Sequence, residues 1–303
     1  MKDALLLLPD FLLIVCGFAI CRYTFLNRSV WDAVERLVYH LLFPVLLFTS
    51  IVRTPLQPGT TLGLAATGLA TVACGIGLAY ALRRLPGVDP VLHASGAQVA
   101  FRFNSYVALA LAERLAGTQG VAWVALLVAL CVPLCNVGAV LPLARQGGHH
   151  FLRELMRNPL IVSTLSGLAV NLLGIGLPDF ALTTLSRIGQ AALPLGLMAV
   201  GAGLHLGGLA AAPALASGLL AIRHAVLPAL AIVFGLTLKL PPGQLTVVLA
   251  FSALPTASSC YVLAMRMGGN GPFVAGLVTV STLLGMVTVP AWLALRQVIA
   301  PGS

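Results

Sequence analysis

Four polar side chains lie close together in an otherwise apolar stretch of the sequence. Gln98, Arg102, Asn104 and Ser105 fall near the middle of GAQVAFRFNSYVALALAER. A stretch of this length can cross a bilayer, and polar groups at its centre are costly and often functional. No Asp or Glu lies at that depth to pair with Arg102, so the guanidinium favours an anionic ligand.

A second polar group lies in VVLAFSALPTASSCYVLAMRMGG. Pro255 lacks an N–H and clashes with the carbonyl four residues back, so it breaks or kinks a helix. The hydroxyls of Thr256, Ser258 and Ser259 can bond the backbone groups that the break frees. Two interrupted helices that cross are typical of a transport site, and their half-helix N-termini suit an anion. We expect substrate to bind at this crossing.

The composition excludes a soluble enzyme. Of 303 residues, 59% are hydrophobic and 8% are charged, whereas soluble domains carry about a quarter charged residues. The formal net charge of +9 comes from basic residues that stand singly between apolar runs. That pattern is typical of membrane proteins, whose cytoplasmic loops are basic, and it argues against a nucleic-acid partner.

The fold class that follows is an all-α polytopic membrane protein in contact with the lipid bilayer. Because one span needs about 20 apolar residues, the chain has room for ten of them and for no separate soluble domain. The predicted spans are 4–25, 36–53, 60–82, 92–114, 121–144, 159–177, 185–206, 214–238, 245–267 and 273–297.

The basic residues also predict an orientation. Loops after odd-numbered spans hold nine Lys and Arg residues, against six in the termini and the other loops. The positive-inside rule therefore puts the central polar stretch Arg145–Asn158 in the cytoplasm and both termini outside, in the cell (inner) membrane.

The two halves of the chain, 1–150 and 151–303, carry traces of a repeat. A shift of 150 residues superposes Pro9 on Pro159, Gly17 on Gly167 and Pro44 on Pro194. A shift of 155 places Asn104-Ser-Tyr-Val on Ser259-Cys-Tyr-Val. Five spans in each half would give the halves opposite orientations, as in many secondary transporters.

No enzyme or metal motif accompanies these features. The sequence has no HExxH, no intramembrane Asp pair, no P-loop and no CxxC, so we expect no catalysis, metal or cofactor. Two further polar positions stay open. Asn136 either pairs with a neighbouring helix or lines a cavity. Arg223 and His224 mark a second polar site or reach the membrane interface, and we favour the interface.

Six segments give the chain a family resemblance. The chain resembles the auxin efflux carrier family, within the bile/arsenite/riboflavin transporter superfamily, and the resemblance spans nearly the whole chain. The segments are FRFNSYVALALA (101–112), VPLCNVGAVLPL (132–143), NPLIVSTLSGLAVNLLGIGLP (158–178), LPLGLMAVGAGL (193–204), LPTASSCYVLAMRMGG (254–269) and VTVSTLLGMVTVP (278–290).

The resemblance implies ten helices in two inverted five-helix repeats, with broken helices four and nine crossing at the substrate site. Helices 1, 2, 6 and 7 would form a scaffold able to form a homodimer, and helices 3–5 and 8–10 a transport unit that moves like an elevator. It also implies that Asn104 contacts a carboxylate, that Pro255 is the crossover proline and that Asn136 lies near the site.

The chain departs from the plant carriers of this family in three ways. It lacks a proline at the fourth-helix crossover, it has no acidic residue in LGLAATGLATVACGIGLAYAL, and its central loop is short. Short members of the family are associated with small carboxylates such as malate, malonate or lactate. We therefore expect a secondary transporter of a small mono- or dicarboxylate, including auxin-like acids. The alternatives are a sodium-coupled bile-acid-type carrier and a carboxylate sensor that does not transport.

Overall fold

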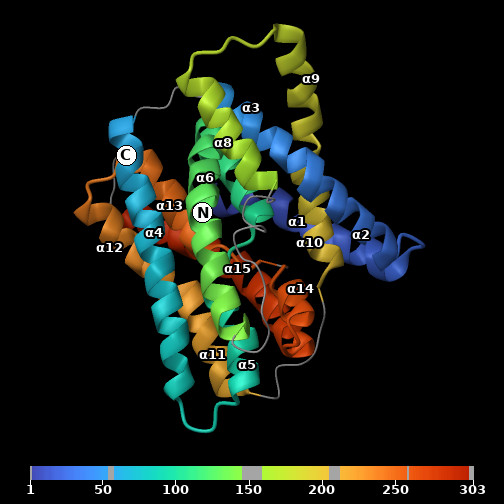
Figure 1. The fold of residues 1–303 in the computed structure, drawn as a ribbon, viewed down its shortest axis with the longest axis vertical. Helices are drawn as coiled ribbons and strands as arrows, with labels where there is room; N and C mark the ends of the chain where they lie inside the picture. The colour runs from blue at the N-terminus through green and yellow to red at the C-terminus, as the bar shows by residue number, and fades with distance from the viewer. Residues whose placement is uncertain (1, 54–57, 145–158, 205–211, 258, 300–303) are drawn as a thin grey trace.

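The protein is helical throughout the residues that its structure describes. This structure is a computed structural model, and it describes residues 2–53, 58–144, 159–204, 212–257 and 259–299. These ranges contain no β-strand. Figure 1 shows long helices that run side by side over much of the molecule.

The described part of the first half forms six α-helices and three short turns of 3₁₀- or π-helix. In chain order these are α1 (Lys2–Tyr23), α2 (Arg28–Leu37), η1 (Val38–Leu42), α3 (Phe43–Arg53), α4 (Pro58–Ala81), η2 (Leu82–Arg84), α5 (Pro90–Gly96), η3 (Ala97–Ala100) and α6 (Ser105–Ala144). Helix α6 is kinked where Ala116 and Gly117 leave helical geometry, with Gly117 at φ +53°. This kink separates the predicted spans 92–114 and 121–144.

The second half is helical in the same manner. Its elements are α8 (Pro159–Leu172), α9 (Asp179–Gln190), α10 (Ala192–Ala202), α11 (Pro213–Ala221), η5 (Ile222–Val226), α12 (Leu227–Thr237), α13 (Pro242–Ala253), α14 (Ser259–Arg266) and α15 (Gly271–Ile299).

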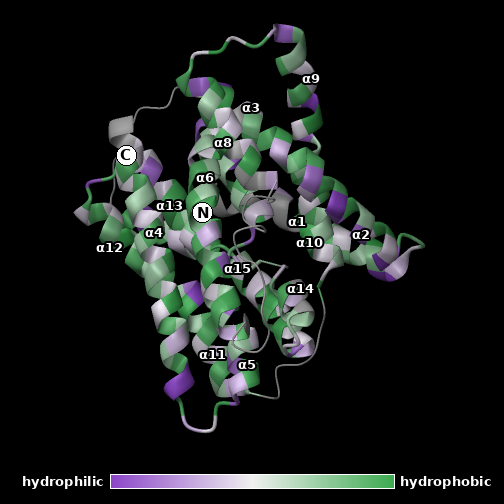
Figure 2. Cartoon of the chain, in the orientation of Figure 1, coloured by the Kyte–Doolittle hydropathy of each residue, from purple (hydrophilic) through white to green (hydrophobic). Residues whose placement is uncertain are grey.

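Five helical segments of the described chain are long and apolar enough to cross a membrane. They are Arg28–Arg53, Thr61–Arg84, Pro90–Leu143, Pro213–Thr237 and Gly271–Ile299. Figure 2 shows that hydrophobic residues run along most of the length of the helices. Because backbone groups in lipid must be satisfied internally, helices are the expected form of such apolar segments. The chain is thus a multi-pass helical membrane protein, and the full count of ten spans stays a prediction.

Helices from the two halves of the chain pack against one another. Helix α1 packs on α10, and α3 packs on α8 and α9. The first of these contacts is close: a Cβ added to Gly17 would overlap the Met198 backbone, and one added to Gly201 would overlap the Ile14 carbonyl. Small residues let membrane helices approach to this distance, because van der Waals packing holds helices together in lipid.

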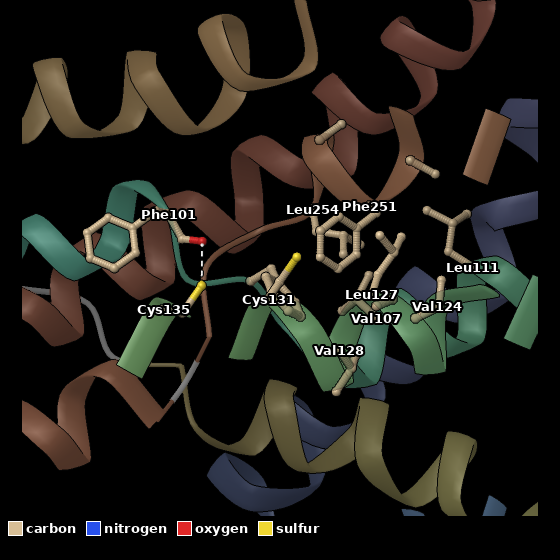
Figure 3. Packing of buried hydrophobic residues seen from close by; sticks show 14 of the residues in the cluster. Phe101, Val107, Leu111, Val124, Leu127, Val128, Cys131, Cys135, Phe251 and Leu254 are labelled. Atoms are coloured by element: carbon tan, nitrogen blue, oxygen red, sulfur yellow. Dashed lines mark hydrogen bonds between the residues drawn. The ribbon is translucent and has the colours of Figure 1, made fainter. Parts of the chain in front are cut away.

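The remaining long helices form a second set of contacts. Helix α6 packs on α4 and α13, and α12 packs on both α4 and α13. Helix α15 contacts α13 and α14. The buried core of the molecule extends through this set, and Figure 3 shows residues of α6 and α13 within it. The two non-helical segments described next lie before α6 and between α13 and α14.

Candidate functional site

The chain leaves helical geometry between η3 and α6. Residues 101–104 form a short non-helical link between them. Phe101 is buried there, and its carbonyl accepts a hydrogen bond of 3.4 Å from the Cys135 thiol of α6. Figure 3 shows this contact, which fixes the link against the body of α6. No proline is needed for this interruption.

Asn104 begins the helix that follows. Its side-chain Oδ1 accepts from the backbone N–H groups of Tyr106 at 3.0 Å and Val107 at 3.3 Å, as an N-cap residue does. The other end of the amide is different. Asn104 is 3% exposed, and its Nδ2 has no hydrogen-bond partner among the described residues. A buried donor left without an acceptor costs about 1–3 kcal/mol, so this Nδ2 group is available to donate to a ligand oxygen.

A second interruption separates α13 from α14. Helix α13 ends at Ala253, and residues 254–257 are non-helical. Pro255, within this stretch, is buried, and its ring lies beside Gly285 of α15, where an added Cβ would come within 3.2 Å of it. Helix α13 therefore ends two residues before Pro255, and a single membrane-spanning helix broken by this proline stays a prediction.

Direct hydrogen bonds join the two interrupted segments. The Asn104 N–H donates to the Pro255 carbonyl at 2.9 Å, and the Thr256 hydroxyl donates to the Arg102 carbonyl at 3.1 Å. The Gln98 amide donates to the Cys260 carbonyl at 3.1 Å. Backbone groups freed in each segment are thus satisfied by the other, as the absence of water in a bilayer core requires.

Arg102 lies on the partly exposed side of this junction. Its Nη1 donates to Gln98 Oε1 at 2.8 Å, and its Nη2 donates to the Ser259 hydroxyl at 3.2 Å. No carboxylate of the described residues lies within ion-pair distance of Arg102. The ion pairs in the described part of the chain join Arg28 to Asp32 and Glu35 on α2. The Arg102 charge is therefore held by neutral groups and not cancelled.

The structure brings six of the eight predicted site residues together. These are Gln98, Arg102, Asn104, Pro255, Thr256 and Ser259. Ser258 lies outside the described residues. Asn136 is partly buried on α6, one position after the Cys135 that contacts Phe101, and no hydrogen bond to the other six is found in the described chain.

A backbone donor at the second interruption is bonded within the protein. The Thr256 N–H donates to the Ser281 hydroxyl of α15 at 2.9 Å. Ser281 in turn lies 2.9 Å from Nε2 of His224, whose Nδ1 lies 3.0 Å from the Thr288 hydroxyl. Ser281 was not among the predicted site residues. Its place in the family-like segment 278–290 is the signal that could have identified it.

The prediction that Arg223 and His224 reach the membrane interface is wrong. Arg223 is 1% exposed and His224 is 6% exposed, and both hydrogen-bond to groups inside the protein. Sequence position could not separate the two alternatives, because a residue near the middle of a helix can face either lipid or protein. The bonding groups lie in the last turn of α13, at Leu254 directly after it and on α15, all distant from Arg223 and His224 in the sequence.

The described residues form a multi-pass helical membrane protein in which the non-helical stretches 101–104 and 254–257 hydrogen-bond to each other beside the Arg102 guanidinium. The family model described as "Membrane transport protein" matches residues 141–293, which is half of the chain. The chain belongs to this family, and the resemblance to auxin efflux carriers is confirmed. It is therefore a membrane transporter.

A curated relative matches over a longer stretch. The chain is 26% identical over 300 residues to a Rhizobium meliloti (strain 1021) protein named "Putative malonate transporter". The match covers 94% of this chain and 92% of the relative. The likeness therefore extends over both halves of the chain, and each half contains one of the interrupted segments.

Proposed function

We propose that this chain is a secondary active transporter of a small organic anion, a mono- or dicarboxylate, bound where the two interrupted segments meet. The single observation that carries the proposal is the buried Asn104 Nδ2, which has no partner in the described part of the chain and lies two residues from a guanidinium that no described carboxylate neutralises. A carboxylate is the ligand that satisfies both, because it accepts hydrogen bonds and carries negative charge.

Malonate is the first substrate to test. The Rhizobium meliloti relative is named for it, and a dicarboxylate offers one carboxylate to each donor. In this arrangement Asn104 orients one carboxylate and Arg102 compensates the charge of the other, while Gln98 and Ser259 hold the guanidinium in place. A monocarboxylate would use one of the two contacts and bind more weakly.

At the level of the fold, we propose ten spans in two inverted repeats, 1–150 and 151–303. The paired contacts of α1 with α10 and of α8 with α3 support this, because they relate the first predicted span to the seventh and the sixth to the second. Gly17 and Gly167, equivalent under the repeat, both lie at these contacts: a Cβ at Gly167 would come within 3.2 Å of the Phe48 carbonyl.

Alternating access would then move one set of helices against the other. Spans 1, 2, 6 and 7 form the proposed scaffold, which also carries the homodimer interface, and spans 3–5 and 8–10 form the transport unit. The hydrogen bonds between the two interrupted segments support a transport unit that moves as one body, as an elevator does. In this proposal both termini lie on the extracytoplasmic side of the inner membrane.

The test is uptake of labelled malonate into proteoliposomes that contain the purified full chain. The key variant is Asn104→Asp, which keeps the N-cap oxygen of α6 but replaces the amide donor with a negative charge. We expect uptake to fall at least tenfold while the melting temperature stays near that of the wild type. Asn27→Asp is the matched control, since Asn27 caps α2 in the same way, away from the junction.

Equal uptake by wild type and Asn104→Asp would place the substrate elsewhere. Malonate binding without uptake would favour the carboxylate sensor. Uptake of bile acids that depends on Na⁺ would favour the sodium-coupled carrier instead.

A further inference from the structure

Arg223 is a fully buried cation outside the proposed substrate site. It lies on the π-helical turn η5, and it is the largest of the side chains with less than 2% exposure. Its Nε donates to the Leu254 carbonyl at 2.6 Å, and its Nη2 donates to the carbonyls of Phe251 at 3.2 Å and Ser252 at 2.9 Å. One guanidinium thus binds three backbone carbonyls.

Two of these carbonyls, those of Phe251 and Ser252, belong to the last turn of α13, and the third is that of Leu254, which directly follows the helix. The last carbonyls of a helix have no partner within it and carry the negative end of the helix dipole. Helix α13 ends inside the protein because Pro255 follows, so water cannot serve as the partner. In transporters with interrupted helices, such half-helix ends are where coupling cations are coordinated.

The charge of Arg223 has no acidic partner among the residues that the structure describes. No ion pair to it is found in the described residues, and the sequence contains no Asp or Glu after Asp179. The carbonyl dipoles of α13 are therefore the groups that stabilise this buried charge, and the charge in turn stabilises the end of the helix.

We infer that the Arg223 guanidinium is a resident cation that fills the cation site at the C-terminal end of α13, so that no Na⁺ binds there. Arg223 is a positioning residue: it fixes the Leu254 carbonyl, one position before the Pro255 whose carbonyl accepts from Asn104. The consequence for transport, that substrate movement does not need Na⁺, rests on the proposed function.

The test measures melting temperature of the purified full chain in NaCl and in choline chloride at equal ionic strength, without substrate. We expect the wild type to melt at the same temperature in both salts. Arg223→Ala should melt roughly 5–10 °C lower in choline chloride, because three carbonyls lose a charged donor. NaCl should restore a saturable part of that loss, since Na⁺ can enter the vacated site.

Two further variants separate a filled cation site from simple structural support. Arg296→Ala is the matched control, because Arg296 is also buried and donates to a carbonyl of α13, that of Pro242, at the opposite end of the helix. Its loss of melting temperature should be equal in both salts. Arg223→Lys keeps the charge and should restore much of the stability, again with no difference between salts.

Equal destabilisation of Arg223→Ala in both salts would reduce Arg223 to structural support, and a wild type stabilised by Na⁺ would overturn the inference outright. If Arg223→Ala does not fold, the wild type and Arg223→Lys carry the test, and Na⁺-dependent stabilisation of either contradicts it. Because no substrate is present, these results stand whether or not malonate is transported.

Discussion

At the scale of single residues, the proposed substrate site gives Asn104 and Arg102 separate roles toward a carboxylate. The Asn104 amide is buried and rigid, since its other end caps α6, and it can orient one oxygen. The Arg102 guanidinium is partly exposed and held by two neutral partners, and it supplies charge. A buried donor gives directional selectivity, whereas an exposed charge attracts anions over a longer range.

This division of roles predicts an effect of Arg102 on substrate class. In Arg102→Gln the charge is lost while a side chain that can bond Gln98 and Ser259 remains. We expect the apparent affinity for malonate to fall about 10–100-fold, as loss of one charge-assisted hydrogen bond does. The affinity for a monocarboxylate such as lactate should fall much less. Competition uptake with both acids measures the two effects, and equal losses would contradict the assignment.

Ser281 carries a second prediction at this scale. In Ser281→Ala the buried Thr256 N–H loses its acceptor and His224 loses one of its two partners. We expect a loss of about 1–3 kcal/mol in stability. Because Thr256 bonds the Arg102 carbonyl, malonate uptake should fall as well. Thr282→Val is the control, since that buried hydroxyl donates to the Val278 carbonyl in its own helix. Melting and uptake that match this control would remove Ser281 from the site.

At the scale of elements, close helix packing and helix interruption have different causes. The contact of α1 with α10 depends on missing side chains at Gly17 and Gly201. The break after α13 depends on the missing N–H of Pro255, whereas the break before α6 depends on an N-cap residue and a thiol contact. The chain thus interrupts its two helices by different local chemistry and still bonds them to each other.

The α1–α10 contact predicts a strong position effect for glycine. In Gly201→Ala the new methyl group would overlap the Ile14 carbonyl, and backbone cannot move as a flexible side chain can. We expect a loss of about 1–3 kcal/mol, the usual cost of overpacking. Gly77→Ala in α4 is the control, because no heavy atom lies within 4 Å of its added Cβ. Its stability should rise slightly or not change. The melting temperatures of the two variants in detergent test this prediction. An equal change in both would contradict the close α1–α10 contact.

At the scale of the whole molecule, net charge decides how transport responds to voltage. One elementary charge that crosses 100 mV of membrane potential changes the free energy by about 2.3 kcal/mol. The proposed Na⁺ independence leaves the anion without a sodium counter-charge. We therefore expect malonate uptake to depend on an imposed potassium-diffusion potential unless another charge moves with it. Uptake at clamped potentials from −100 to +100 mV reports the stoichiometry, and Na⁺ should change neither the rate nor its slope.

Residue pattern alone predicted much of the candidate site. Pro255 follows from the geometry of proline, and the polar group of Gln98, Arg102 and Asn104 stands out against an apolar background. These residues could be recognised because a bilayer makes polar groups costly and therefore conspicuous. The same logic failed for Arg223, because the cost of burying a charge does not reveal which groups hydrogen-bond to it. Its partners lie 28 to 31 residues away in the sequence.

The sequence by itself determined that this is a multi-pass helical membrane protein, because 59% hydrophobic residues in long runs admit no other form in lipid. It also determined the family. Only the tertiary structure decided that Asn104 bonds the Pro255 carbonyl, that its Nδ2 is left without a partner in the described chain, and that Arg223 binds the end of α13. The physical reason is that hydrophobicity and helix breaks act locally along the chain. Hydrogen bonds between interrupted helices depend on how distant segments pack, which sequence spacing does not specify.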